Sequence, residues 1–169
     1  MTCRLIASAL MGVLMSTAVG AATHDSPLLG VWVLDVSKLP LPPGAKPPRS
    51  VTLTLRDLDD SRWSMAIDTV NADGSRRHTA STFRLDGTPA AVSDTAGGEV
   101  DTASITCPNA STMVIGATSA EQLSTTRVFT VSPDGRHETE TIIWRGFDGK
   151  PHTRTNSWMR EKAKRNQSP

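Results

Sequence analysis

Glu138 and Glu140 are the residues whose type and spacing come closest to a catalytic pair. On an extended strand, side chains two positions apart point to the same side, so both carboxyls would share a face with Ile142 and Trp144. If that face is buried, the two carboxyls would have perturbed pKa values, which general acid/base catalysis requires. If it is exposed, they are solvated carboxylates that pair across strands with groups such as Arg154, which is the simpler interpretation.

Metal binding is the second kind of chemistry to consider, because several ligating side chains would have to converge. The histidines have no i, i+4 pairing and no Cys-x-x-Cys beside them; they are His24, His78, His137 and His152. His137 and His152 flank one expected hairpin and could meet across it, although histidines at hairpin ends are usually just solvated. We therefore expect no metal and no cofactor.

Nucleophilic chemistry has little support in the residues. Removal of an N-terminal signal containing Cys3 would leave Cys107 as the only thiol, and no charged neighbour in the sequence would lower its pKa. The chain also lacks a Gly-x-Ser-x-Gly turn and a glycine-rich phosphate loop. The sequence therefore predicts no catalytic residue and a protein that is not an enzyme, with an acid/base enzyme using Glu138 and Glu140 as the alternative.

The amino-acid composition argues against proteins that bind nucleic acid or acidic membranes. The 169 residues contain 18 Lys+Arg and 17 Asp+Glu, so no strong net charge attracts nucleic acid or an acidic membrane. Aromatic residues make up 4% of the chain and tyrosine is absent, which leaves few platforms for stacking bases. The basic clusters at 76–78 and 162–165 lack interleaved aromatics and are expected to be solvated. We expect no nucleic-acid partner.

The N-terminus has the order of residues typical of a secretory signal. A short basic stretch ending at Arg4 precedes an apolar run over 5–19, and small residues lead to Ala22. This run is short for a membrane span, so cleavage near Ala22 is favoured over a retained anchor. We expect a signal peptide over 1–22, one domain over 23–161 and a flexible basic tail over 162–169. The mature protein would be secreted or periplasmic, with no integral membrane segment and an oligomeric state left open.

The elements that would position these residues are strands. Asp-Gly and Gly-Gly pairs recur at intervals suited to hairpins. Between them, apolar and polar residues mostly alternate, which indicates half-buried strands. The expected strands are 28–36, 50–57, 62–70, 75–84, 88–93, 99–106, 111–117, 122–131, 136–145 and 151–160. A short helix near 118–124 is a weaker possibility.

So many antiparallel strands in one sheet normally curl and close. The sequence therefore predicts an all-β fold, an antiparallel up-and-down β-barrel of 8–10 strands, with a two-sheet sandwich as the rival. The segment 37–49 holds five prolines and is expected to be an extended loop. The residues expected to line or fill the interior, and to bind a ligand if a cavity exists, are Trp63, Met65, Ile67, Phe83, Phe129 and Ile142.

The first and last strands carry a recognisable pair of motifs. The first contains Gly30 and Trp32 as Gly-x-Trp, and the last ends in Arg160. This arrangement resembles the lipocalin pattern, which implies that Trp32 closes the floor of the barrel and that Arg160 lies across its indole ring. A cation over a tryptophan face contributes about 0.5–2 kcal/mol, and glycine allows close approach of the backbone.

The whole set of motifs is similar to a group of short, secreted, lipocalin-like bacterial proteins without an assigned role. The shared features are Ser37–Lys38 before the proline-rich loop, the Ser132–Arg136 turn and Thr139–Thr141 after it. The resemblance covers most of 28–161. It also implies that the loop at 38–49 folds over the open end as a lid, the alternative being a plain connector.

Three functions follow as hypotheses. The leading one is an exported lipocalin-like binding protein that holds a small, mainly apolar molecule inside the barrel. The second is a small periplasmic enzyme that uses Glu138 or Glu140 as an acid/base group. The third is a packed barrel that interacts with another protein and holds no ligand.

Overall fold

The computed structural model describes residues 25–162 except 99, 121 and 147, and these residues form an all-β protein. The expected signal peptide, its cleavage site, His24 and nearly all of the basic tail lie outside the described residues. A short 3-10 helix, η1 (Val36–Lys38), follows the first strand. The strands are β1 (Gly30–Leu34), β2 (Ser50–Asp57), β3 (Arg62–Val70), β4 (Arg76–Arg84), β5 (Ala90–Ala91), β6 (Ser93–Asp94), β7 (Thr102–Asn109), β8 (Thr112–Ser119), β9 (Gln122–Val131), β10 (His137–Arg145) and β11 (Pro151–Arg160).

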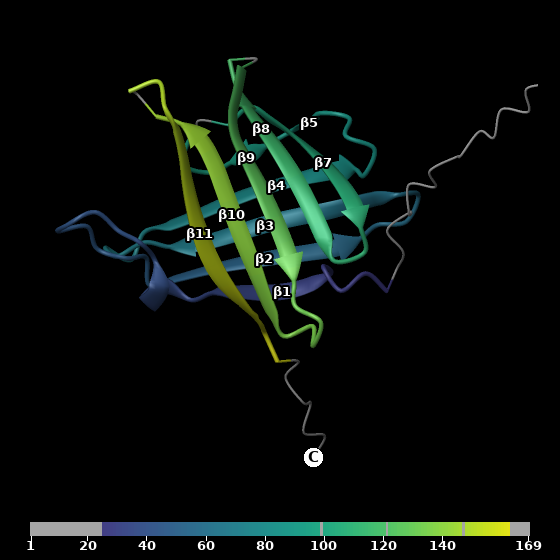
Figure 1. Cartoon of the computed structure of the whole chain (residues 1–169), viewed down its shortest axis with the longest axis horizontal. Coiled ribbons are helices and arrows are strands. Elements are labelled where there is room, and N and C mark those ends of the chain that lie inside the picture. The colour runs from purple at the N-terminus through teal and green to yellow at the C-terminus, as the bar shows by residue number, and fades with distance from the viewer. Residues whose placement is uncertain (1–24, 99, 121, 147, 163–169) are drawn as a thin grey trace, which may run out of the picture.

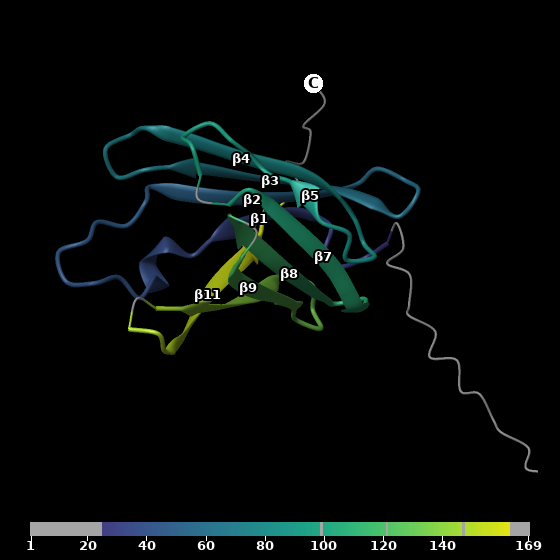
Figure 2. The same cartoon turned by 90° about the horizontal axis from the view of Figure 1, so that it is seen from above.

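The strands make one antiparallel sheet in the order β5-β7-β8-β9-β10-β11-β1-β2-β3-β4-β6. The last strand pairs with the first, so the chain order continues around the sheet from β7 to β4. The short segment 90–94 brings the two edges together, because its first half pairs with β7 and its second half with β4. The result is a nearly closed up-and-down barrel (Figures 1 and 2), so the predicted barrel is confirmed and the rival sandwich is not the architecture.

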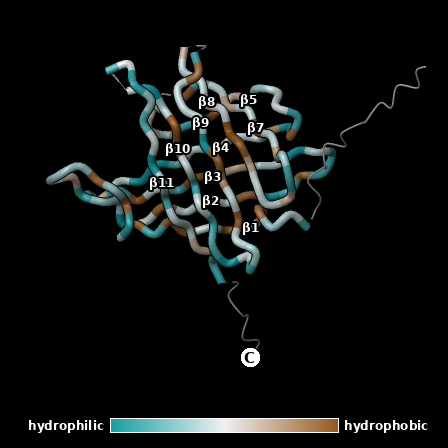
Figure 3. The backbone as a smooth tube through the Cα atoms, viewed as in Figure 1, coloured by the Kyte–Doolittle hydropathy of each residue, from teal (hydrophilic) through white to brown (hydrophobic). Residues whose placement is uncertain are grey.

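Alternation along the strands places apolar side chains inside the barrel, as period-two patterning requires. The most hydrophobic stretches of the chain lie within the strands, whereas several hairpin turns are hydrophilic (Figure 3). The fully buried large side chains include Trp32, Trp63, Phe83 and Phe129. Burial of this apolar surface is the main stabilising contribution to the fold.

Two details of the expected strands are wrong. The expected strand 88–93 is interrupted, because Val92 separates β5 from β6 and each half pairs with a different neighbour. The expected short helix near 118–124 does not form, since β8 runs to Ser119 and β9 begins at Gln122. Ala120 between them has a positive φ of 48° and donates its N–H to Asp101, which makes a tight turn there.

One end of the barrel, the floor, is closed by Trp32 and Arg160. The guanidinium carbon of Arg160 lies 4.2 Å from the centre of a Trp32 ring. The indole N–H of Trp32 donates to the carbonyl of Leu28 at 2.9 Å. Gly30 has a φ of +125°, and a Cβ there would lie 2.6 Å from Nη1 of Arg160, so this glycine permits the close approach.

Arg160 also closes the floor through its hydrogen bonds. Its Nε donates to the carbonyl of Gly135 at 2.6 Å and its Nη1 donates to that of Leu29 at 2.7 Å. Its Nη2 donates to the carbonyl of Pro27. One side chain thus joins the N-terminal segment, the β9–β10 turn and β11.

The all-β architecture leaves little helix in the described residues. Within them, no helix has the length and apolar character needed to cross a membrane.

Candidate functional site

A cavity of about 390 Å³ lies inside the barrel. Its wall is built from strands on every side of the barrel, because the inward faces of all the strands except the two-residue β5 contribute to it. The apolar part of the wall consists of Leu34, Val51, Leu53, Met65, Ile67, Val92, Val100, Ala103, Ile115, Ala117, Phe129 and Trp158. A volume of this size is at the lower end of the range for small-molecule sites.

The proline-rich loop forms part of the cavity wall. Leu39, Leu41 and Pro48 all line it, and these three side chains are half-buried while most of the loop is exposed. The loop rejoins the sheet where the N–H of Arg49 donates to the carbonyl of Val70 at 2.7 Å. Figure 2 shows the loop at the end of the barrel where β10 turns into β11, opposite the floor, and we call this end the mouth.

The six residues expected to bind a ligand divide into two groups. Met65, Ile67 and Phe129 line the cavity. The others are buried but do not line it; they are Trp63, Phe83 and Ile142. Trp63 and Phe83 face each other across β3 and β4 near the floor, where they fill the interior. Sequence alternation identifies the inward face but does not distinguish a cavity from packed core.

Glu140 is a buried carboxylate in the cavity wall, and both of its oxygens accept hydrogen bonds. Its Oε2 accepts hydrogen bonds from Nδ2 of Asn156 at 2.8 Å and Nε1 of Trp158 at 3.1 Å. Its Oε1 accepts from Nη1 of Arg127 at 2.9 Å, which completes an ion pair. The residue is only 1% exposed. Three donors satisfy the buried carboxylate and hold it in one place.

Glu138 is buried to the same degree but has a different environment. Neither of its carboxyl oxygens has a hydrogen-bond partner among the described residues. Burial raises the pKa of Glu138 to about 8, and the nearby charge of Glu140 adds to the rise while Arg160 opposes it. Glu138 lies toward the floor, opposite Val131 and Trp158, and does not line the cavity.

The face that carries the two glutamates therefore points inward, and the simpler interpretation of solvated carboxylates is wrong. The alternation of β10 between exposed and buried residues shows this directly. The two glutamates nevertheless have different surroundings. Glu140 lines the cavity and accepts hydrogen bonds from three donors, whereas Glu138 does not line the cavity.

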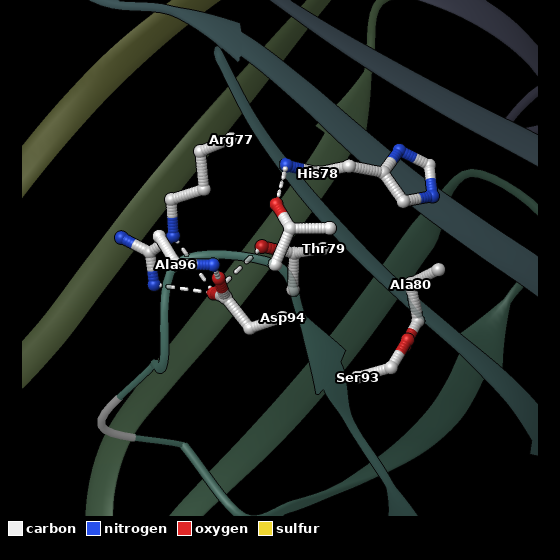
Figure 4. A network of polar contacts seen from close by, with 8 residues as sticks. Arg77, His78, Thr79, Ala80, Ser93, Asp94 and Ala96 are labelled. Carbon is white, nitrogen blue, oxygen red and sulfur yellow. Dashed lines mark hydrogen bonds and ion pairs between the residues drawn. The ribbon is translucent and has the colours of Figure 1, made fainter. Parts of the chain in front are cut away.

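A second ion pair lies on the opposite wall, where β6 meets β4 (Figure 4). One carboxylate oxygen of Asp94 lies 2.5 Å from Nη2 of Arg77 and accepts from the hydroxyl of Thr79 at 2.9 Å. The other oxygen accepts from the N–H of Ala96 at 2.9 Å. The Arg77 guanidinium and these hydrogen bonds hold the pKa of Asp94 at about 2, against the effect of burial. The Nε of Arg77 donates to the first oxygen as well, at 2.7 Å, so four contacts hold Asp94 where the barrel closes.

Arg154 and Asn156 are cavity residues that the sequence places on one strand but does not mark as a site. Both lie on the inward face of β11, and both line the cavity. The Nε of Arg154 and the Oδ1 of Asn156 are buried and have no hydrogen-bond partner within the described residues. The sequence signal was their spacing of two in a strand beside Glu140, which reports a shared face but not its direction.

The remaining candidates for chemistry lie apart from the cavity. His137 and His152 do not meet, because they pair with Met159 and Trp144 at opposite ends of the β10–β11 hairpin. Burial raises the pKa of the Cys107 thiol to about 11, which makes it a poor nucleophile. In the part of the chain that the structure describes, no three His, Cys, Asp or Glu side chains gather in a way that could hold a metal ion.

The barrel is compatible with a calycin-like fold, the wider class to which lipocalins belong. A scan against models of known protein families finds no match for this chain, and a search of curated proteins finds none either.

Proposed function

We propose that this is an exported binding protein that holds a small, mainly apolar molecule in its barrel. The observation that carries the proposal is the interior cavity of about 390 Å³, whose wall is mainly apolar. Barrels of this size class either fill their interior with side chains or hold one small ligand. Here Trp63 and Phe83 fill the interior near the floor, whereas Met65, Ile67 and Phe129 border open space.

The loop at the mouth supports the same proposal. Leu39 and Leu41 turn their side chains toward the cavity, while Pro40 and Pro42 between and after them are exposed. Prolines restrict φ, so this loop loses less conformational entropy on ordering than a flexible loop would. Such a segment is suited to cover an apolar ligand and to move when the ligand enters or leaves.

The surroundings of the glutamates favour binding over catalysis. An acid/base residue has to reach the substrate and exchange a proton with it. Glu138 has a suitably raised pKa but lies outside the cavity wall. Glu140 faces the cavity, but three protein donors already occupy its oxygens.

A fluorescent probe tests the proposal. N-phenyl-1-naphthylamine, a neutral apolar dye, should bind the protein with one-to-one stoichiometry and gain fluorescence. Ile67→Trp adds bulk inside the cavity and should abolish this binding, whereas Ile143→Trp, on the exposed side of β10, should leave it unchanged. Melting curves check that both variants fold. Equal dye binding by wild type and Ile67→Trp would contradict a ligand site in the barrel.

Export is tested separately. The sequence of residues 1–22 supports cleavage near Ala22. N-terminal sequencing of the protein from the exported fraction should begin near Thr23. Recovery from a membrane fraction of a chain that still begins at Met1 would contradict cleavage of a signal peptide.

A further inference from the structure

The charged side chains that line the cavity do not balance. Arg77 pairs with Asp94, and Arg127 pairs with Glu140. Arg154 is the third cation of the wall, and within the described residues it makes no hydrogen bond or ion pair. The Nε–H of Arg154 is shielded from water and has no acceptor, which is costly because the lost hydration of this N–H is not offset by a hydrogen bond.

Asn156 adds an unpaired acceptor next to this unpaired donor. Its Nδ2 donates to the carboxylate of Glu140, which can only accept, so the orientation of the amide is determined and Oδ1 is the free atom. The residue is 5% exposed and faces the cavity. Arg154 and Asn156 are two positions apart on β11, so their Cα atoms are separated by about 7 Å along the same face.

The two unpaired groups restrict the ligand. A purely apolar molecule would bury the N–H of Arg154 and the oxygen of Asn156 without partners, and a cationic ligand would face an unpaired positive charge. A carboxylate satisfies Arg154, and a hydroxyl beside it satisfies Oδ1 of Asn156. The apolar remainder of the wall, including Ile67 and Phe129, would then contact a hydrocarbon chain.

We infer, resting on the function proposed above, that the cavity takes an amphiphilic hydroxy acid: a medium-length hydrocarbon chain with a carboxylate that pairs with Arg154 and a neighbouring hydroxyl that donates to Asn156. The chain lies along the apolar wall, and the head is held at β11. Arg127 stays paired with Glu140, which leaves Arg154 as the anion-binding residue of the site.

Displacement of N-phenyl-1-naphthylamine by four ligands with a ten-carbon chain, each below its micelle concentration, tests this inference. The expected order of affinity is 3-hydroxydecanoate, then decanoate, then 1-decanol, with decyltrimethylammonium weakest. Methylation of the hydroxyl removes its donor, so 3-methoxydecanoate should bind roughly twofold to tenfold less tightly than 3-hydroxydecanoate.

Substitution of Arg154 gives the matched protein test. Arg154→Gln should weaken binding of both acids by about tenfold to a hundredfold, because a hydrogen bond to a charged group is lost, and should leave the dye and 1-decanol nearly unchanged. Arg56→Gln removes the same charge from an exposed position on β2 and should change none of these affinities. Melting curves check the folding of both variants.

The outcomes separate the two proposals. If the dye binds in the cavity but the acids bind no better than 1-decanol, or Arg154→Gln leaves acid binding intact, the hydroxy-acid inference is wrong and the binding function stands. If calorimetry detects neither dye nor acid binding to the wild-type protein, both proposals are wrong.

Discussion

Two arginines on the inward face of β11 have opposite surroundings. Arg160, at the floor, donates to three backbone carbonyls and lies over the ring of Trp32. Arg154, near the mouth, has no partner among the described residues, although its Nε is buried. The same type of side chain therefore has its hydrogen bonds satisfied by the protein at one end of the barrel and leaves a buried N–H unsatisfied at the other. For these two arginines, the presence or absence of hydrogen-bond partners, rather than the residue type, separates the packed floor from the cavity wall.

The floor should be the more costly end to disrupt. Trp32 is fully buried, and its replacement by alanine leaves a cavity and removes the partner of Arg160. Trp32→Ala should lower the free energy of unfolding by about 3–5 kcal/mol, as measured by chemical denaturation. Trp144→Ala provides the control, because Trp144 is only partly buried and stacks on exposed His152. A loss for Trp32→Ala no larger than for Trp144→Ala would contradict the role of the floor.

Glu138 should give the floor a pH dependence. Its pKa of about 8 in the folded protein exceeds the ordinary 4.5, so the folded state holds a proton that the unfolded state has released between these values. Its contribution to stability is therefore complete below pH 4.5 and declines as the pH rises toward 8.

Glu138→Gln should remove this decline. At pH 8 the variant should be more stable than wild type by on the order of 2–3 kcal/mol, with a smaller difference at pH 5, in denaturation curves at both pH values. Glu161→Gln, at an exposed carboxylate, is the matched control. Parallel pH profiles for wild type and Glu138→Gln would show that burial of Glu138 does not affect folding.

The ion pair at the closure of the barrel should have a smaller effect of opposite sign. Asp94 has a lowered pKa, so its contribution is present above pH 3.8 and is lost as the pH falls toward 2. Because Arg77 is 45% exposed, solvent screening reduces the contribution. Asp94→Asn should lower the stability by roughly 1 kcal/mol at pH 7 and by much less near pH 2. An equal loss at both pH values would mean that packing, and not charge, is responsible.

The mouth should tolerate change with the least loss of stability. Deletion of residues 40–47 removes a largely exposed segment and leaves the β1–β2 pairing unaltered. The melting temperature should change little, whereas the dissociation rate of the dye should rise in stopped-flow measurements, because Leu41 no longer covers the cavity. Unchanged dye kinetics would mean that the loop is only a connector.

The sequence predicted the fold well because its signals are local. Alternation and Asp-Gly turns indicated nearly every strand, and the barrel followed from their number. The exceptions are 88–93, which pairs with both edges of the sheet, and 118–124, where a single residue of positive φ makes the turn. Both depend on long-range pairing or on backbone geometry that residue types only weakly specify.

The candidate site was predicted less completely. Met65, Ile67 and Phe129 follow from alternation, but alternation does not separate them from Trp63 and Phe83, which fill the floor. A cavity forms where the side chains of several strands together leave part of the interior unfilled, and no local sequence pattern encodes this.

The polar residues of the cavity wall were also hard to predict from the sequence. Glu140 and Asn156 have buried side chains that a polar residue type alone would place outside. Their inward direction is set by the register of β10 with β11, which a single sequence leaves open.

Native mass spectrometry of the protein purified from its natural source tests the binding claim most directly. Under gentle ionisation, wild-type protein should carry one bound small molecule that mild activation releases, and negative-ion analysis should identify a carboxylic acid with a hydrocarbon chain. Ile67→Trp, produced and purified in the same way, should have the mass of the bare chain. A bare mass for wild type, together with no dye binding in solution, would contradict a ligand-binding barrel.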